Sequence, residues 1–400
     1  MRAEPKVALV HEWLVDYSGS ERVVEQMLRC YPQADLFSVV DFLRDDERGF
    51  LGGRRARTSF IQRLPGARKH FRRYLPLMPL AVEQLDLRGY DLVLSSSHAV
   101  SKGVITGPDQ VHVSYVHSPM RYAWDLQHEY LREGGLQRGP SSWLARAVLH
   151  YLRQWDVRTA HGVDQFVANS HYIARRIRKV YRRESTVVYP PVDLERFTPT
   201  IEKDRYFLAA SRMVPYKRMP LIVEAFAGLP QHRLVVVGEG PDLARVQALA
   251  ANAPNIELLG YQEGADLVAL MAKARAFVFA AEEDFGITPV EAQACGTPVI
   301  AYGAGGAVET VIDDPDPLRR TGVLYDEQTV PAIQAAVERF VRLADDGGFD
   351  SQVCRFNAER FSLDAFARGL QAAVDASVAA AQGSAWCLPA GALRPQNGST

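Results

Sequence analysis

The fold is decided by the stretch Ala276-Phe-Val-Phe-Ala-Ala-Glu-Glu-Asp-Phe-Gly-Ile-Thr-Pro-Val-Glu-Ala-Gln-Ala-Cys-Gly-Thr-Pro-Val-Ile-Ala301. It begins and ends with short apolar runs, which are typical of strands buried on both faces of a sheet. Between the runs, Thr288, Pro289 and Glu291 predict a helix start, with Thr as the N-cap and Pro at the first helical position. Gly296 is placed to end that helix. Strand, helix and strand together predict a parallel sheet with right-handed crossovers.

The same alternation of apolar runs and helical periodicity continues through the chain, whose 400 residues are typical of about two domains. This alternation is interrupted at residues 189–199, where three prolines in eleven residues disfavour both a helix and a central strand. We interpret this segment as a linker, with an α/β domain on each side. The last residues, 381–400, are rich in Gly, Ala, Ser and Pro and are interpreted as a loose tail.

Composition excludes several classes of protein. With 47% hydrophobic and 23% charged residues, the chain is neither wholly disordered nor collagen-like. Its four cysteines include no C-x-x-C pair, which favours a reducing compartment and argues against a zinc ribbon or an iron–sulfur cluster. The apolar run Val7–Val10 is interrupted by His11 and Glu12, so it is too short for a signal peptide. No run approaches the ~20 residues of a membrane-spanning helix. We expect a cytoplasmic protein.

The loop and helix start inside the quoted stretch predict an anion site. The amides of Gly286, Ile287 and Thr288 should point out at the carboxyl edge of the sheet, where open α/β sheets bind ligands and a helix N-terminus favours phosphate. Glu283 lies just before this helix and Glu291 in its first turn. Taken alone, Glu283 would be a solvated loop carboxylate and Glu291 only the partner of the helix cap.

Two cations follow the apolar run that ends near Ala210. Arg212 and Lys217 should therefore lie on a loop at the same carboxyl edge, where Arg supplies a planar fork and Lys a point charge for phosphate. The alternative is a pair of solvated cations in surface salt bridges, worth ~0–1 kcal/mol. The predicted anion site beside them favours the functional interpretation.

The motifs of the chain resemble those of the retaining glycosyltransferases of family 4. The spacing Glu283-x7-Glu291 is similar to that family's signature, and Ser211–Lys217 to its Arg/Lys phosphate loop. Further similar segments are Val237-Gly-Glu-Gly-Pro241, Asn255–Tyr261, Gly303-Ala-Gly-Gly306 with Glu309, Val116-His117-Ser118-Pro119, Ala168-Asn169-Ser170 and Ser18-Gly19-Ser20-Glu21. The resemblance spans roughly residues 6–370 and is thinner in the N-terminal half.

This resemblance implies the GT-B fold, an α/β architecture of two facing Rossmann-like domains with parallel sheets and an interdomain cleft. Residues 1–195 would form the acceptor- and membrane-facing domain, joined by a C-terminal helix over 362–380. Residues 196–361 would form the donor domain. The co-substrate would be a nucleotide sugar, with no other cofactor.

The resemblance also implies roles for individual residues. Arg212 and Lys217 would hold the donor diphosphate and stabilise the leaving group, Glu291 would accept from the ribose hydroxyls, and Glu283 would hold hydroxyls of the donor sugar. His117 would hydrogen-bond the transferred sugar, whereas His98, His112 and His128 are interpreted as structural. The remaining donor-binding candidates are Gly19, Gly240, Tyr261, Phe285, Gly286, Ile287 and Thr288. Gly19 is equally compatible with a simple turn.

No carboxylate pair can be assigned as nucleophile and acid, so same-face substitution is favoured, with the leaving diphosphate as base. A covalent intermediate is the alternative mechanism. No metal is expected, because Asp314-Pro-Asp316 matches a metal motif in its letters but is better interpreted as a turn.

Charge is distributed unevenly. Residues 1–200 hold 29 basic and 22 acidic residues, although the net charge of the chain is −1. Residues 48–82 contain nine bases and no acid, interleaved with apolar residues, which suits an anionic membrane surface. The alternative is a solvated face, and nucleic acid is not expected because the whole chain is not basic.

Membrane contact would fit a polyprenyl-diphosphate-linked saccharide acceptor, with the protein peripheral on the inner face of the cell membrane. Residues 116–125 are most similar to bacterial mannosyltransferases of surface-polysaccharide assembly, which use GDP-mannose. The alternatives are a UDP-sugar donor, a nucleotide-sugar epimerase and a non-catalytic binding subunit. A dinucleotide oxidoreductase is disfavoured because Gly238-x-Gly240 lacks a third glycine.

Overall fold

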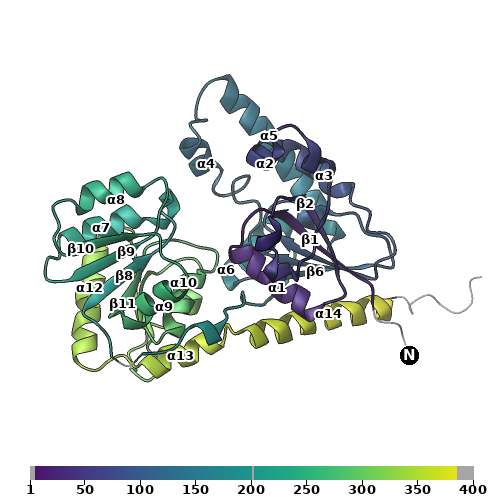
Figure 1. The fold of residues 1–400 in the computed structure, drawn as a ribbon. Coiled ribbons are helices and arrows are strands. Elements are labelled where there is room, and N and C mark those ends of the chain that lie inside the picture. Colours follow the sequence, from purple (N-terminus) through teal and green to yellow (C-terminus); the bar gives the residue numbers. More distant parts are fainter. Residues whose placement is uncertain (1–4, 201, 385–400) are drawn as a thin grey trace, which may run out of the picture. The chain divides into compact units, whose positions relative to one another are not determined.

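The computed structural model describes residues 5–200 and 202–384, which fold into two compact units (Figure 1). The N-terminal unit contains the described residues up to Val167, together with Ile177–Thr186 and the described residues from Arg368 to Ser384. The C-terminal unit contains Ala168–Arg176 and Val187–Ala367. The prediction of two Rossmann-like α/β domains is confirmed.

The N-terminal unit is built on a seven-stranded sheet of order β3-β2-β1-β4-β5-β6-β7. The described pairings, β1 with β2 and β4, β2 with β3 and β4 with β5, are parallel. The strands are β1 (Val7–Leu14), β2 (Asp35–Asp41), β3 (Arg57–Thr58), β4 (Leu92–Ser97), β5 (Val111–Val116), β6 (Gln165–Ala168) and β7 (Ser185–Val187). The helices are α1 (Gly19–Cys30), α2 (Ala67–His70), α3 (Met78–Glu83), α4 (Gln127–Glu133) and α5 (Pro140–Thr159). Two further helices, α6 (His171–Tyr181) and α14 (Leu363–Ser384), are divided between the units, because α6 up to Arg176 and α14 up to Ala367 belong to the C-terminal unit.

The C-terminal unit is built on a six-stranded sheet of order β10-β9-β8-β11-β12-β13, in which every neighbouring pair is parallel. The strands are β8 (Tyr206–Ala210), β9 (Arg233–Val237), β10 (Ile256–Gly260), β11 (Ala276–Phe279), β12 (Val299–Tyr302) and β13 (Gly322–Tyr325). The helices are α7 (Met219–Ala227), α8 (Leu243–Ala250), α9 (Gly264–Lys273), α10 (Ile287–Ala294), α11 (Ala307–Thr310), α12 (Val330–Asp345) and α13 (Ser351–Glu359).

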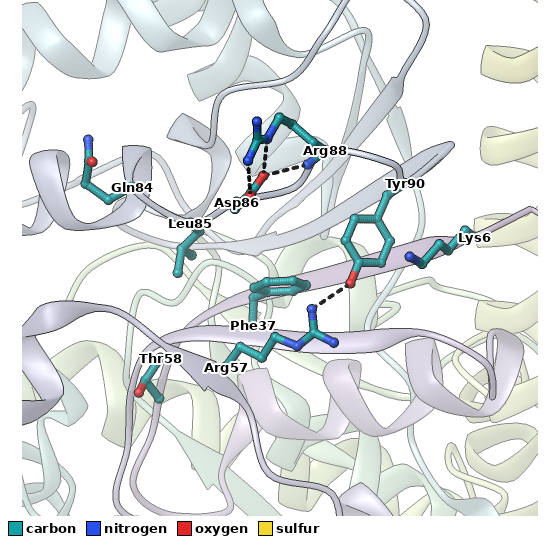
Figure 2. Close-up of a pocket in the computed structure, with 9 residues that line it drawn as sticks. All are labelled: Lys6, Phe37, Arg57, Thr58, Gln84, Leu85, Asp86, Arg88 and Tyr90. Atoms are coloured by element: carbon teal, nitrogen blue, oxygen red, sulfur yellow. Dashed lines mark hydrogen bonds and ion pairs between the residues drawn. The ribbon is translucent and has the colours of Figure 1, made fainter.

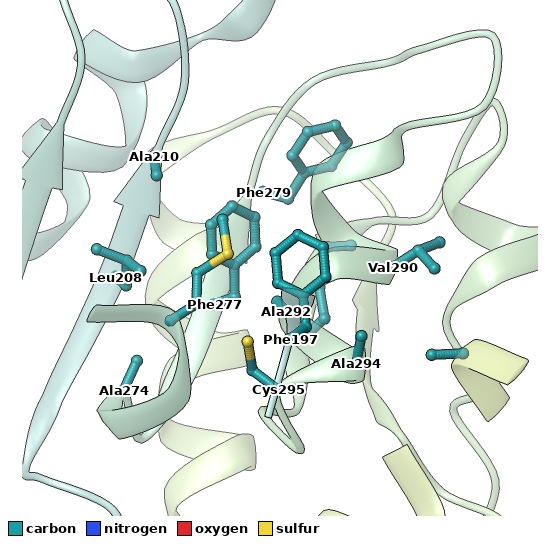
Figure 3. Close-up of a cluster of buried hydrophobic side chains, with 14 of the residues drawn as sticks. Phe197, Leu208, Ala210, Ala274, Phe277, Phe279, Val290, Ala292, Ala294 and Cys295 are labelled. Carbon is teal, nitrogen blue, oxygen red and sulfur yellow. The ribbon is translucent and has the colours of Figure 1, made fainter. Parts of the chain in front are cut away.

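Both faces of the C-terminal sheet are buried, as the continuous apolar runs predicted. On one face, Leu208 and Phe277 pack against α9 and α10 in a cluster that Figure 3 shows. On the other face, Phe207 and Val278 pack against α7, α8 and α12. Because adjacent strand residues point to opposite faces, each strand contributes to both clusters. This double burial fixes the strand ends, from which the candidate residues project.

The predicted start of helix α10 was wrong. The helix begins at Ile287 after an N-cap at Gly286, which has φ +83°, so Thr288 lies inside the first turn rather than at the cap. A left-handed backbone is accessible to glycine at little cost, and here it overrides the capping signal of Thr288 and Pro289. Glu291 is consequently not the partner of a cap, and it lies buried in the middle of the helix.

The segment Asp314–Asp316 forms the predicted turn. The backbone N–H of Asp316 donates to the Asp314 carboxylate at 2.9 Å, which confirms that prediction. Helix α14 extends to Ser384, so the first residues of the segment 381–400 are helical and the rest lie outside the described residues. Among the described helices, none combines the length and the apolarity needed to cross a membrane.

Candidate functional site

The strand orders place the candidate residues where ligand sites occur in open α/β sheets. In the C-terminal sheet the order reverses between β8 and β11; Arg212 and Lys217 follow β8, and Glu283 follows β11. In the N-terminal sheet the order reverses between β1 and β4, and Gly19 follows β1 as the first residue of α1. A crevice forms outside the strand ends at such a reversal, and it is the usual binding position.

At the C-terminal reversal the structure brings Lys217 and Glu283 together as an ion pair. Their side chains are only 14% and 17% exposed, so the pair is largely shielded from water. The Lys217 ammonium also lies 5.8 Å from the centre of the Phe279 ring. Arg212 lies nearby in sequence on the same loop, and it is exposed. The pair therefore places a cation and a carboxylate together at the carboxyl edge of the sheet.

The two neighbours of Glu283 are held by residues of α6. Tyr172 donates its hydroxyl proton to Glu282 at 3.0 Å, and Arg176 pairs with Asp284 at 3.0 Å. The two flanking carboxylates are thus engaged by α6, whereas the carboxylate of Glu283 pairs with Lys217. The segment Ala168–Ser170, noted for its resemblance to the family, leads into this helix.

Two glycines of the segment Gly303–Gly306 allow the acidic loop to pack closely. A Cβ at Gly305 would lie 2.2 Å from the carbonyl oxygen of Glu283, and one at Gly306 would lie 2.3 Å from Cα of Phe285. The N–H of Gly306 donates to that same Glu283 carbonyl at 2.8 Å. Any larger residue would displace the loop, so these glycines position Glu283.

Gly240 supports the Arg212 loop in the same way. It has φ +147°, and a Cβ there would lie 2.5 Å from the carbonyl oxygen of Met213. The N–H of Met213 donates to the Glu239 carbonyl at 2.7 Å, which joins the loops after β8 and β9. Tyr261 lies apart, after the edge strand β10, where it is 61% exposed and donates to Glu263 at 3.1 Å. That hydrogen bond raises the pKa of Tyr261.

Helix α10 begins after β11, with its N-cap at Gly286. Ile287 and Thr288 form its first turn and are partly exposed. Phe285 differs from the expectation, because its ring is 3% exposed and packs against Phe361 at a centroid distance of 5.4 Å. Any donor contact of Phe285 therefore has to come from its backbone.

In the N-terminal unit, His117 directly follows β5 and its Nε2 lies 2.9 Å from Oγ of Ser96. Its ring centre lies 6.2 Å from that of His98. Burial, together with the nearby His98 and His11, lowers the pKa of His117 to about 3, so the ring is neutral near pH 7. His112, interpreted as structural, is buried with Nε2 2.9 Å from Oγ of Ser95.

Sequence reasoning quoted Glu21 only as the end of the family-like segment Ser18–Glu21 and gave it no role, whereas in the structure it organises the start of α1. One of its oxygens lies 3.1 Å from Nε2 of His11. The other accepts from the backbone N–H of Ser18 at 3.1 Å and from the hydroxyls of Ser18 and Ser20 at 2.8 and 3.0 Å. Although burial alone would raise it, the hydrogen bonds of His11 and Ser18 lower the pKa of Glu21 to about 2. The carboxylate thus fixes the loop that contains Gly19.

Glu12 was missed in the same way. One of its oxygens accepts the backbone N–H groups of His98, Ala99 and Ser101 at 2.9, 2.8 and 3.1 Å, and its other oxygen lies 3.0 Å from Nδ1 of His98. Against the effect of burial, His98 holds the pKa of Glu12 well below its usual range. The available signal was a His–Glu pair inside a buried apolar strand, since buried charges require partners.

A pocket of about 320 Å³ at the amino edge of the N-terminal sheet contains none of the candidate residues. Figure 2 shows the Arg57 guanidinium beside the Phe37 ring, 5.5 Å from its centre, donating to the Tyr90 hydroxyl at 3.2 Å. The pocket lies at the start of β1 and β4, whereas ligands of such sheets bind at the carboxyl ends.

Two family models match the chain. Residues 17–196 match the family described as Glycosyltransferase Family 4, and residues 192–347 match the one described as Glycosyl transferases group 1. Together the two matches cover both sides of the predicted linker.

Curated relatives match over part of their length. A GDP-mannose-dependent monoacylated alpha-(1-6)-phosphatidylinositol monomannoside mannosyltransferase of Corynebacterium glutamicum is 30% identical over 213 residues, or 46% of this chain and 54% of the relative. A D-inositol 3-phosphate glycosyltransferase of Salinispora arenicola is 32% identical over 257 residues, or 54% of this chain and 56% of the relative. The chain thus spans about half the length of the curated relatives it matches.

Solved structures match over nearly the whole chain. The HepE protein of Anabaena in complex with UDP has a TM-score of 0.65 at 15% identity, covering 93% of this chain and 100% of that one. A sucrose-phosphate synthase of Thermosynechococcus elongatus has a TM-score of 0.68 at 20% identity, covering 94% and 100%. At these identities the likeness concerns the fold alone. With its two matched halves and its two parallel-sheet units, the chain belongs to the family 4 glycosyltransferases and has the GT-B fold.

Proposed function

We propose that the protein transfers mannose from GDP-mannose to a glycan or polyprenyl-diphosphate-linked saccharide, with retention of configuration. The observation that carries the proposal is the shielded Lys217–Glu283 pair at the strand-order reversal, beside the start of α10. The donor is supported by two relatives whose names specify GDP-mannose.

In this proposal the pair binds the donor, and no metal or other cofactor is expected. A diphosphate entering beside Lys217 would compete for its ammonium, and Glu283 would then accept hydrogen bonds from sugar hydroxyls. Arg212 and the first-turn amides of α10 would add positive potential for the phosphates. Glu291, on the same helix, would accept from the ribose hydroxyls.

The mechanism we favour is same-face substitution. The bond between the anomeric carbon and the diphosphate oxygen breaks as the acceptor oxygen attacks the same face, and the leaving oxygen takes the acceptor proton. Lys217 and Arg212 would stabilise the growing negative charge on the leaving group. A covalent sugar–enzyme intermediate is the alternative.

Donor identity is tested by thermal unfolding with GDP-mannose, UDP-glucose and an ADP-sugar. GDP-mannose is expected to stabilise most, by ~2.7 kcal/mol at 100 times its dissociation constant. The shift should disappear in Lys217→Ala and persist in Lys179→Ala, an exposed lysine of α6. Transfer should be unchanged in chelator. Stronger protection by a UDP-sugar would exclude the GDP-mannose assignment, and binding without transfer to any acceptor would favour a non-catalytic subunit.

We further propose that the basic segment, residues 48–82, contacts an anionic membrane and holds the protein on its inner face. Some of its bases are engaged within the fold, such as Arg48, which pairs with Asp41 at 2.8 Å and is buried. Five others are exposed on the turns and helices around α2 and have no ion pair among the described residues: Arg63, Arg68, Lys69, Arg72 and Arg73. Phe60, Leu77 and Leu80 are 40%, 41% and 50% exposed among them. Exposed bases with apolar neighbours suit a lipid surface.

Replacing Arg72 and Arg73 by glutamate is expected to reduce sedimentation with anionic vesicles, because each base near the surface contributes ~1 kcal/mol. Parent binding should weaken steeply with salt, since exposed charges are screened beyond ~10 Å at 0.1 M. The double variant Arg175→Glu, Arg178→Glu reverses two exposed bases of α6 and serves as the control. Equal sedimentation of both double variants would assign the basic segment to a solvated face.

A further inference from the structure

The hydroxyl of Ser96 lies between two histidine rings. Its Oγ is 3.1 Å from Nδ1 of His11 and 2.9 Å from Nε2 of His117. A serine hydroxyl has one proton to donate, so it can donate to only one of these nitrogens. The other histidine must then donate an N–H to the Ser96 oxygen. The protonation of one histidine therefore determines that of the other.

The contact at the other ring nitrogen of His11, Nε2, limits which protonation states of His11 are possible. Its Nε2 lies 3.1 Å from an oxygen of Glu21, whose depressed pKa keeps that carboxylate ionised. An ionised carboxylate only accepts, so His11 always carries a proton on Nε2. The single variable is whether Nδ1 of His11 is also protonated.

We propose that His11 and Glu21 are positioning residues that select the tautomer of His117 through Ser96. When His11 is a cation, its Nδ1–H donates to Ser96, Ser96 donates to Nε2 of His117, and the proton of His117 resides on Nδ1. When His11 is neutral, Ser96 donates to it instead, and His117 must carry its proton on Nε2. Only the consequence for transfer rests on the proposed function.

The charges around His11 favour the cation. It faces Glu21 from α1, Glu12 on its own strand, His98 after β4 and His117 after β5. Burial lowers the pKa of His11, but the hydrogen bond and charge of Glu21, with the charge of Glu12, raise it above its ordinary value of 6.5. His117 stays neutral. Near neutral pH, His117 should therefore offer an N–H at Nδ1 to whatever group that nitrogen meets.

The same carboxylate also holds the loop Ser18–Ser20 through its second oxygen. Glu21 thus joins two candidate features that lie far apart in the sequence, the Gly19 loop and His117. A change at Glu21 should reach His117 although the two side chains are separated by His11 and Ser96.

The tautomer can be read directly by nitrogen–proton correlation spectroscopy of the full chain labelled with ¹⁵N-histidine. His117→Gln identifies the His117 signals. At about pH 6, below the ordinary pKa of histidine, the parent should carry the proton on Nδ1 of His117. In Glu21→Gln, which keeps an oxygen acceptor for His11 but removes the charge, the proton should move to Nε2. Ser95→Ala is the control, because it should change His112 alone.

A pH titration of the parent protein provides the same test without a substitution. The tautomer of His117 should change with the same midpoint as the titration of His11, above pH 6.5. An unchanged tautomer through the titration of His11, or in folded Glu21→Gln, would overturn the proposal. Because the spectrum needs no donor or acceptor, a failure of the proposed function leaves this readout intact. Full transfer by His117→Gln would instead refute the role of His117.

Discussion

Replacing His117 with alanine is expected to slow sugar transfer at saturating donor by about 10²–10³-fold, by analogy with the loss of one transition-state hydrogen bond. The affinity for GDP should stay close to that of the parent, because the diphosphate groups are assigned to Arg212 and Lys217. His117 is partly exposed as a residue at the end of β5, and Ser96 keeps its contact with His11 after the substitution. The measurements are GDP affinity by calorimetry and the transfer rate.

Two further variants separate an effect on GDP affinity from an effect on the transfer rate. Arg212→Ala should weaken GDP itself by about 1.5–3 kcal/mol, the contribution of a charged hydrogen bond. His128→Ala removes an exposed imidazole of α4 and should leave both quantities unchanged. Near-normal turnover of folded His117→Ala, or unfolding of that variant alone, would make the histidine structural.

The largest effect on stability is expected for Asp156→Asn, about 3–5 kcal/mol, because it leaves a buried ammonium without its counter-charge. Asp156 pairs with Lys102 at 2.8 Å, and the two side chains are 0% and 2% exposed. The carboxylate also accepts from Nε1 of Trp124 at 2.8 Å and from the Tyr181 hydroxyl at 3.1 Å. The pair joins α5 to the segment after β4 and to α6.

The effect can be measured by urea unfolding followed through tryptophan fluorescence, since Trp124 and Trp155 both lie beside the pair. Glu257→Gln is the matched control, because its partner Arg233 and Glu257 itself are 59% and 45% exposed. An exposed pair contributes about 0–1 kcal/mol. If both variants unfolded at the same denaturant concentration, the buried pair would contribute no more than a surface one.

The sequence predicted those features that depend on short-range patterns. The buried strands β8 and β11 were evident from continuous apolar runs, and their ends placed Arg212, Lys217 and Glu283 at one edge. That Lys217 and Glu283 form a pair depends on β8 and β11 being neighbours, and strand order is a long-range property that no local pattern specifies.

The errors have equally physical causes. The residues at Thr288, Pro289 and Glu291 match the sequence pattern of a helix N-cap. The left-handed backbone at Gly286 nevertheless starts the helix earlier. His11 and Glu12 were treated only as the end of an apolar run, because their partners Ser96 and His98 lie about 85 residues further along the chain. A polar pair inside a buried strand indicates distant partners but does not identify them.

The glycines that pack against the acidic loop constrain any attempt to redesign the enzyme for another sugar. Every side chain at Gly305 or Gly306 would overlap the main chain of Glu283 and Phe285. In a mutant library that varies those two positions, most variants would therefore have a displaced acidic loop. Useful diversity has to come from side chains with room around them. Thr288 and Ile287 on the partly exposed first turn of α10 are the positions where new shapes can be introduced while the carboxylate stays in place.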